Sequence, residues 1–112
     1  ETGLVHETTS VYVPVRSASL GQNYPNPFNP TTRIEYRLPE AGPGGKTDVS
    51  LVVYDVRGAR VRVLVSGEQA VGKHVVEWDG RNDAGSPVGS GVYFYRMTTP
   101  GFADVRKMVL LK

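Results

Sequence analysis

The chain has 112 residues, the length of one domain, and its formal net charge of +2 at pH 7 is too small to indicate a nucleic-acid or anionic-membrane partner. It contains no cysteine, which excludes disulfide scaffolds, zinc–thiolate sites and thiol catalysis, and no stretch approaches the roughly 20 apolar residues of a transmembrane segment. Thirteen glycines and eight prolines favour a turn-rich, all-β fold.

Residues 1–19 are expected to lie outside the main domain. Glu1-Thr2-Gly3 is typical of residues left by a secretion expression vector, and the Ser/Thr-rich stretch after it has the composition of a linker. Val11–Val15 has strand-forming side chains, but Pro14 restricts such a strand to the edge of a sheet. We therefore expect a linker or a loosely docked edge strand here, and a single domain at residues 20–112 that belongs to a longer parent protein.

Residues 23–30, called the Asn/Pro segment below, carry three prolines within six positions. Proline fixes φ and removes a backbone donor, and it keeps the preceding residue out of the helical region. The segment therefore cannot be a helix or the centre of a sheet. We expect a stiff, extended or turned lead-in, in which Pro25 and Pro27 restrict where the first strand of the domain starts.

Six segments after this lead-in show the alternation or the β-branched and aromatic enrichment that is typical of strands. In the first, Ile34, Tyr36 and Leu38 share one face, which predicts one buried and one wet face. In the second, both faces are largely apolar, as in a central strand. The predicted strands are Thr32–Leu38, Asp48–Val56, Arg60–Val65, Lys73–Trp78, Val92–Thr98 and Val105–Leu111.

Turns and loops separate these strands. Gly58 permits the positive φ of a tight turn, so the second and third strands are expected to form a hairpin with Val61, Val63 and Val65 on one face. Loops are expected at residues 40–46, 66–72 and 79–87. Short strands with frequent turns predict an all-β, immunoglobulin-like β-sandwich of about seven antiparallel strands, and we expect it to be a monomer.

Catalytic and metal-binding patterns are weak in this chain. Asp79-x-Arg81-x-Asp83 faintly follows a calcium loop, but the third position is an arginine and the sixth is Ala84, so a loop whose Asp and Asn side chains bond their own backbone is favoured. The two histidines, His6 and His74, lack a third ligand, and no Gly-x-Ser-x-Gly elbow is present. We expect no enzyme activity, no metal and no cofactor.

Two surface patterns have a functional and a structural interpretation. Arg57, Arg60 and Arg62 form either an anion- or polysaccharide-binding patch or a solvated strand face whose charges discourage edge pairing, and we favour the second. Tyr93, Tyr95 and Trp78 form either a platform for stacking sugars or half of a sandwich core. We favour core packing for all three.

Several motifs, taken in order, resemble the type A C-terminal sorting domain of the type IX secretion system, which occurs on secreted proteins of Bacteroidota and related bacteria. The residues that carry the resemblance are Leu20–Thr32, Val53–Gly58, Gly72–Gly80, Ser90–Arg96 and Arg106–Lys112. The stretch Trp78–Gly85, followed by Val88-x-x-Gly91-Val92-Tyr93, is also similar to the immunoglobulin-like domain of the flagellar hook-capping protein. The Asn/Pro segment and the Lys-Met-x-Leu-x-Lys end favour the sorting domain.

The resemblance to the sorting domain implies a non-catalytic module that directs a secreted bacterial protein through the periplasm and across the outer membrane to the cell surface. Its implied partners are the outer-membrane secretion machinery, a sortase-like peptidase and an N-terminal cargo domain of the parent protein. A last strand at a sheet edge is expected to be open to a partner by strand addition. The candidate recognition residues are Asn23, Pro25, Asn26, Pro27, Gly91, Tyr93, Lys107, Met108 and Lys112.

Two rival functions remain open at this point. An accessory carbohydrate-binding module would expose Trp78, Tyr93 or Tyr95 in a row, so burial of all three would exclude that platform. A structural assembly module, as in hook capping, would form oligomers.

Overall fold

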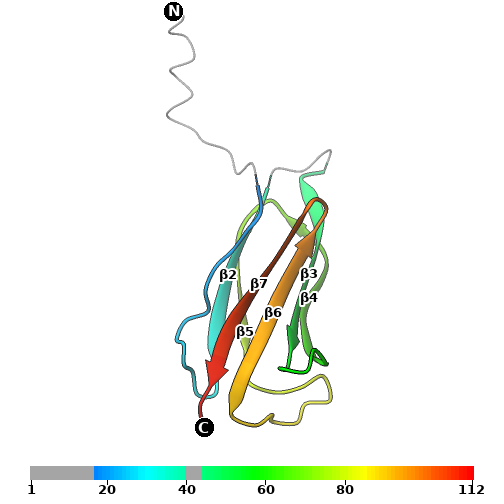
Figure 1. Ribbon diagram of the computed structural model, residues 1–112. Coiled ribbons are helices and arrows are strands. Elements are labelled where there is room, and N and C mark those ends of the chain that lie inside the picture. Colours follow the sequence, from blue (N-terminus) through cyan, green and yellow to red (C-terminus); the bar gives the residue numbers. More distant parts are fainter. Residues whose placement is uncertain (1–16, 40–43) are drawn as a thin grey trace, which may run out of the picture.

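Seven strands pack as two antiparallel sheets in the computed structural model, which describes residues 17–39 and 44–112 (Figure 1). The first sheet has the order β1-β2-β5, with β1 at Ser19–Leu20, β2 at Thr32–Leu38 and β5 at Gly72–Trp78. The second has the order β4-β3-β6-β7, with the strands Arg60–Ala70 (β4), Lys46–Tyr54 (β3), Gly91–Thr99 (β6) and Phe102–Leu110 (β7). The predicted sandwich of about seven antiparallel strands is confirmed, while the edge strand considered at Val11–Val15 lies outside the described residues.

The core fills the space between the two sheets. Ile34, Tyr36, Leu38 and Trp78 point inward from the first sheet, as their period-two spacing predicts, and each is at most 2% exposed. The second sheet contributes Leu51, Val53, Tyr95, Met97, Met108 and Leu110, all fully buried. The last two belong to β7, so the end of the chain is part of the core.

The predicted loop at residues 66–72 is wrong. β4 continues to Ala70, β5 begins at Gly72, and β3 begins at Lys46 rather than Asp48. The Ser-Gly-Glu-Gln composition suggested a loop, but β3 pairs with this stretch from Lys46↔Ala70 to Ser50↔Ser66. Because the ladder with β3 uses the backbone groups, polar side chains are tolerated in this part of β4. The chain then crosses to the other sheet at Val71.

The prediction that Val61, Val63 and Val65 share one face of β4 is also corrected. Irregularities in the β3–β4 register fall between Leu51 and Val52 and between Val53 and Tyr54. Because a bulge adds one residue to one strand, it exchanges the faces of the residues that follow. Val61, Leu64 and Val65 therefore contact the core, whereas Val63 pairs with Val52 away from it. The turn before β4 is as predicted, with Gly58 at a φ of 84°.

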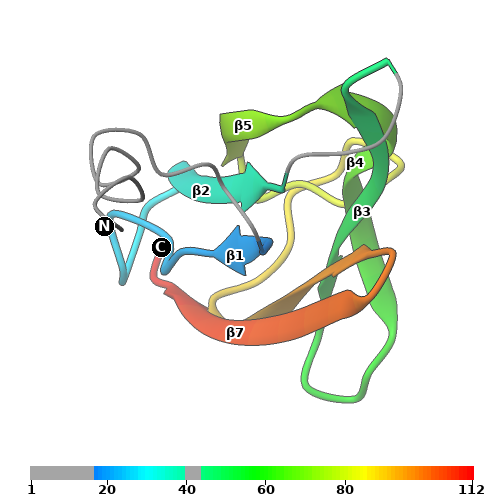
Figure 2. The same ribbon diagram turned by 90° about the horizontal axis from the view of Figure 1, so that it is seen from above.

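The two sides of the sandwich differ in how they are closed. On one side β1 lies beside β7, and on the opposite side the chain passes from β4 into β5 (Figure 2). The described chain begins near the turn between β6 and β7, and it ends at the opposite end of the sandwich (Figure 1). Within residues 17–39 and 44–112, no helix has the length and apolarity needed to cross a membrane.

Candidate functional site

The Asn/Pro segment lies directly against β7. The first and the last of the stretches that resemble a sorting domain are therefore in contact. Phe28 forms a parallel bridge with Leu110. The Phe28 amide donates to the Val109 carbonyl at 3.0 Å, and the Leu111 amide donates to the Phe28 carbonyl at 3.0 Å. This pairing joins residues that are more than 80 positions apart in the chain.

Side chains extend the contact along β7. The Val109 amide donates to Asn26 Oδ1 at 2.9 Å, and Gln22 Nε2 donates to the Lys107 carbonyl at 2.8 Å. Arg106 Nε donates to the Leu20 carbonyl at 2.7 Å. Together with the Phe28 bridge, these contacts define the Asn/Pro–β7 interface, residues 20–28 against residues 106–111.

The interface corrects the expectation that the end of the last strand is open to strand addition. β7 is an edge strand in its own sheet. The carbonyls of Lys107 and Val109 and the amides of Val109 and Leu111 nevertheless already have partners on the outer side of β7. A strand-donating partner would have to displace the Asn/Pro segment to reach them.

Asn23 holds the start of the segment through buried hydrogen bonds. Its side-chain nitrogen donates to Thr32 Oγ1 at 3.0 Å and to the Pro25 carbonyl at 3.2 Å, and its Oδ1 accepts from Gln22 Nε2 at 2.6 Å. Its backbone amide donates to Tyr95 Oη at 2.8 Å. Asn23 is 2% exposed, so it positions the segment from inside the protein.

Tyr95, on β6, completes this network. Its hydroxyl accepts from the Asn23 amide and donates to the Gly21 carbonyl at 2.7 Å. Burial raises the pKa of Tyr95 to about 12, while the hydrogen bond from Asn23 and the charge of Arg106 act in the opposite direction. The phenol is therefore neutral at physiological pH and able to donate as well as accept.

Three aromatic rings hold the other end of the segment. Phe28 packs on Trp78 with ring centroids 5.6 Å apart, and Trp78 packs edge-on against Tyr93 at 5.4 Å. Tyr93 donates its hydroxyl to the Gly89 carbonyl at 2.7 Å, and burial, with the charge of Asp55 adding to it, raises the pKa of Tyr93. Trp78, Tyr93 and Tyr95 are all buried, which confirms core packing and excludes the aromatic sugar platform that these three residues were considered for.

The remaining predicted residues divide into buried and exposed groups. Met108 is fully buried, so it acts in the core. Gly91 begins β6 with a φ of 153°. Five members of the predicted set are exposed and lie on or beside the Asn/Pro–β7 interface: Pro25, Asn26, Pro27, Lys107 and Lys112.

Five residues that hold this interface together were not among the predicted set. They are Gln22, Phe28, Thr32, Tyr95 and Arg106. Phe28 carries a sequence signal, because an aromatic residue between prolines needs an apolar partner. The roles of Gln22, Tyr95 and Arg106 depend on contacts between segments that are distant in the chain, and periodicity carries no information about such contacts.

The loop at residues 79–87 bonds its own backbone, as predicted. Asn82 Oδ1 accepts from the amides of Ala84 and Ser86, each at 3.0 Å, and Asp79 Oδ1 accepts from the Arg81 amide at 3.2 Å. Asp83 instead fastens the loop to β4 by accepting from the Val63 amide at 2.9 Å. In the described part of the chain, no three histidine or acidic side chains converge as metal ligands would.

The three arginines of the possible anion patch are each paired with an acid. Arg57 lies 3.5 Å from Asp55, Arg60 lies 3.1 Å from Asp83, and Arg62 lies 3.4 Å from Asp79. The pKa of Asp55 is lowered, mainly by the hydrogen bond that its carboxylate accepts from the Ala59 amide. These ion pairs favour the interpretation of this region as a solvated strand face of alternating charge, and they argue against an anion-binding patch.

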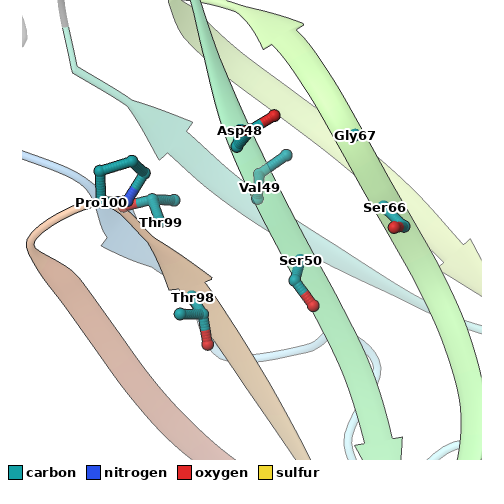
Figure 3. A pocket seen from close by; sticks show the side chains of 8 residues that line it. All are labelled: Asp48, Val49, Ser50, Ser66, Gly67, Thr98, Thr99 and Pro100. Carbon is teal, nitrogen blue, oxygen red and sulfur yellow. The ribbon is translucent and has the colours of Figure 1, made fainter.

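An open pocket of about 520 Å³ lies across β3, β4 and β6, near the turn after β6 (Figure 3). Its described lining includes Asp48, Ser50, Ser66 and Thr98, and Asp48 is the single titratable side chain among the lining residues. Thr99, which also lines it, is 7% exposed and its hydroxyl has no hydrogen-bond partner within the described residues.

Comparison with known proteins identifies related folds. A protein-family model described as the FlgD Ig-like domain matches residues 31–101. No curated protein matches the chain. Dimeric latent PorU from Porphyromonas gingivalis matches with a TM-score of 0.66 and 21% identity over 87% of this chain and 10% of that one.

Two further solved structures share the sandwich. PorZ from the same organism, described as an essential bacterial surface component of the type-IX secretion system, matches with a TM-score of 0.51 and 23% identity over 85% of this chain and 11% of that one. FlgD from P. aeruginosa matches with a TM-score of 0.50 and 19% identity over 87% of this chain and 76% of that one. The chain thus spans about a tenth of the length of PorU and PorZ, and at these identities the likeness establishes the fold.

Proposed function

We propose that this chain, which belongs to the FlgD Ig-like domain family, is a non-catalytic sorting module that directs a secreted bacterial protein across the outer membrane to the cell surface. The observation that carries the proposal is the Asn/Pro–β7 interface, where the first and last stretches that resemble a sorting domain are hydrogen-bonded to each other. The shared fold with PorZ, a surface component of the type-IX secretion system, supports a setting in type IX secretion.

The recognition surface that we propose consists of the exposed part of this interface. Pro25, Pro27, Lys107 and Lys112 are exposed there, beside Leu111, which is 53% exposed. Two lysines next to an apolar side chain suit an acidic partner surface with an apolar centre. Because buried hydrogen bonds already order the segment, binding would lose little conformational entropy.

The arrangement of the two chain ends suits a module that carries cargo. The described chain begins at one end of the sandwich, and the recognition surface lies toward the other (Figure 1). Ala18 and Leu20 are buried, 8% and 3% exposed, so a peptidase that releases the cargo would act before Ala18. Mass spectrometry of the released cargo tests this point, and a cleavage site after Leu20 would contradict it.

The test of sorting is a secretion assay in a bacterium that carries the type IX system. The whole chain is fused behind a signal peptide and an inert reporter, and surface-exposed reporter is compared with periplasmic reporter. We expect export of the wild-type fusion and periplasmic retention when the double charge reversal Lys107→Glu/Lys112→Glu is introduced. Both side chains are exposed, so the fold should persist.

The matched control places the same charge change at the other end of the sandwich, at the exposed residues Arg37 and Lys46, of which Arg37 pairs with Ser19. Arg37→Glu/Lys46→Glu should be exported as the wild type is. If the wild-type fusion stays in the periplasm, the sorting proposal is contradicted. If both double variants are exported equally, only the proposed recognition surface is contradicted.

A structural assembly module is the second candidate function. The family match favours it, as does the extent of the FlgD likeness, which covers 76% of that chain. If the wild-type fusion stays in the periplasm of the type IX host, this second function becomes the better explanation.

A further inference from the structure

The two sheets have four outer edge strands, of which one is very short and two are bonded along part of their length in the described chain. β7 is bonded by the Asn/Pro segment, and β1 has two residues. On β4, the Val63 amide donates to Asp83 Oδ1 at 2.9 Å and the Val61 carbonyl accepts from the Asp83 amide at 2.8 Å. The fourth is β5, which lies at the outer margin of its sheet (Figure 2).

The direction of the backbone groups on β5 follows from its neighbour β2. On β2, Arg33 and Glu35 bond toward the Asn/Pro side, through Tyr24 and Gly21. Since in-plane groups alternate along a strand, the even-numbered residues of β2 bond to β5, and their register partners are also even-numbered. The amides and carbonyls of Lys73, Val75 and Glu77 therefore point to the outer edge, where no hydrogen bond reaches them from residues 17–39 or 44–112.

The side chains of the same three residues lie on the outer face of the sheet. Lys73 is 52% exposed, with its Nζ 3.6 Å from Glu35 Oε1 of the same copy; Val75 is 53% exposed, and Glu77 is exposed as well. An antiparallel pairing of β5 with a second β5, centred on Val75, places each Lys73 opposite the partner copy's Glu77 and the two valines opposite each other. The backbone groups of all three residues point toward the partner strand in this register.

We propose that this edge is a self-association surface, and that two copies of the chain pair β5 to β5 into one continuous six-stranded sheet. The exposed residues of β5 follow the order Lys-x-Val-x-Glu, so a second copy running antiparallel puts each lysine opposite a glutamate. Registers that bring Lys73 opposite Lys73, or Glu77 opposite Glu77, place like charges together and are disfavoured. The partner that fits the edge is therefore another copy of this chain.

The contact is expected to be weak, because it rests on one short strand and two exposed ion pairs per dimer. A contact of this size suits a reversible dimer that forms where the local concentration of the chain is high. We propose a dimer where the sequence alone led us to expect a monomer, because the open edge becomes visible once the neighbours of each strand are known. The proposal does not depend on the sorting function.

The test is sedimentation equilibrium of the purified chain at increasing concentration, with charge reversal at the two positions. Lys73→Glu puts two glutamates opposite each other twice in the dimer, and Glu77→Lys puts two lysines opposite each other twice. We expect each single variant to dimerise roughly tenfold more weakly than the wild type. An equimolar mixture of the two variants restores both ion pairs, as does the double variant, so both should dimerise like the wild type.

A backbone variant tests the same edge independently of charge. Val75→Pro removes an amide that points outward, so the ladder with β2 keeps its hydrogen bonds while pairing with a second copy is lost. The amides of Lys73, Val75 and Glu77 should also exchange more slowly as wild-type concentration rises. Thermal unfolding of every variant checks that the fold is intact, and the mixing experiment decides the question if Val75→Pro does not fold.

Three results would overturn the proposal. The first is a wild-type chain that stays monomeric at the highest concentration reached. The second is a dimer that is unaffected by both single charge reversals. The third is a pair of folded, monomeric single variants whose mixture also stays monomeric.

Discussion

At the residue scale, the candidate site depends on buried polar side chains that hold an irregular segment. Asn23 bonds in four directions, and Tyr95 bonds to the backbone on both sides of Gln22. Leaving a buried donor or acceptor without a partner costs about 1–3 kcal/mol. In the proposed recognition surface, the role of Asn23 is therefore to hold the conformation of its exposed neighbours Pro25 and Pro27.

The hydroxyl of Tyr95 provides a test at this scale. Tyr95→Phe leaves the Asn23 amide and the Gly21 carbonyl without their partner, so we expect the free energy of unfolding to fall by about 1–3 kcal/mol at pH 7. Urea denaturation measures the loss. Tyr24→Phe is the matched control, because Tyr24 is 77% exposed, and it should change stability by less than about 0.5 kcal/mol. Equal effects of the two variants would contradict the role of Tyr95.

The pH dependence of stability follows from the same residue. The pKa of Tyr95 is about 12 in the folded protein, against about 10 in an unfolded chain. Between these values the unfolded state binds fewer protons, so stability falls as pH rises, by up to about 1.4 kcal/mol per pH unit. Tyr95→Phe should flatten this slope, although Tyr36 and Tyr93, whose pKa values are also raised by burial, keep part of it.

At the element scale, the Asn/Pro segment behaves as an additional strand-like piece that closes an edge. It has one parallel bridge to the last strand, one antiparallel bridge between Tyr24 and Arg33, and one buried ring, Phe28. The segment therefore bonds to β2 and to β7, strands of different sheets. Its closure of β7 is what distinguishes this edge from the open edge of β5.

Phe28 is the residue whose loss should release the segment. Phe28→Ala removes a ring that is 2% exposed and packs on Trp78. We expect the free energy of unfolding to fall by about 3–5 kcal/mol, together with faster amide exchange at Leu111.

The prolines of the segment are tested separately. Pro25→Ala/Pro27→Ala keeps the carbonyl of Pro25 that accepts two hydrogen bonds, so it should speed amide exchange mainly within residues 20–30. Unchanged exchange in the second variant would show that the prolines do not hold the segment.

At the scale of the whole molecule, the last strand cannot be separated from the fold. Met108 and Leu110 are fully buried, and the residues around them bond to the Asn/Pro segment. A sorting signal at the end of the chain is therefore tested by changes to exposed side chains, because removal of the strand also removes part of the core.

Deletion of residues 107–112 should abolish cooperative unfolding. The loss of each large buried side chain costs about 2–5 kcal/mol, against a total stability of about 5–15 kcal/mol for a domain. Circular dichroism melting measures the result, with Lys107→Glu/Lys112→Glu as the folded control. A truncated chain that melts cooperatively near the wild-type temperature would contradict this account of the core.

The local rules of the sequence determined much of the fold by themselves. Period-two alternation placed Ile34, Tyr36 and Leu38 inward, and the prolines kept residues 23–30 out of helices and sheet centres. These predictions succeeded because each depends on the backbone of neighbouring residues. The loop at 66–72 failed because a distant strand, β3, satisfies the polar stretch of β4. Tertiary structure alone decided that Asn23 is buried, that Phe28 meets Leu110 and that β5 keeps an open edge, since pairing between distant segments leaves no local pattern in the chain.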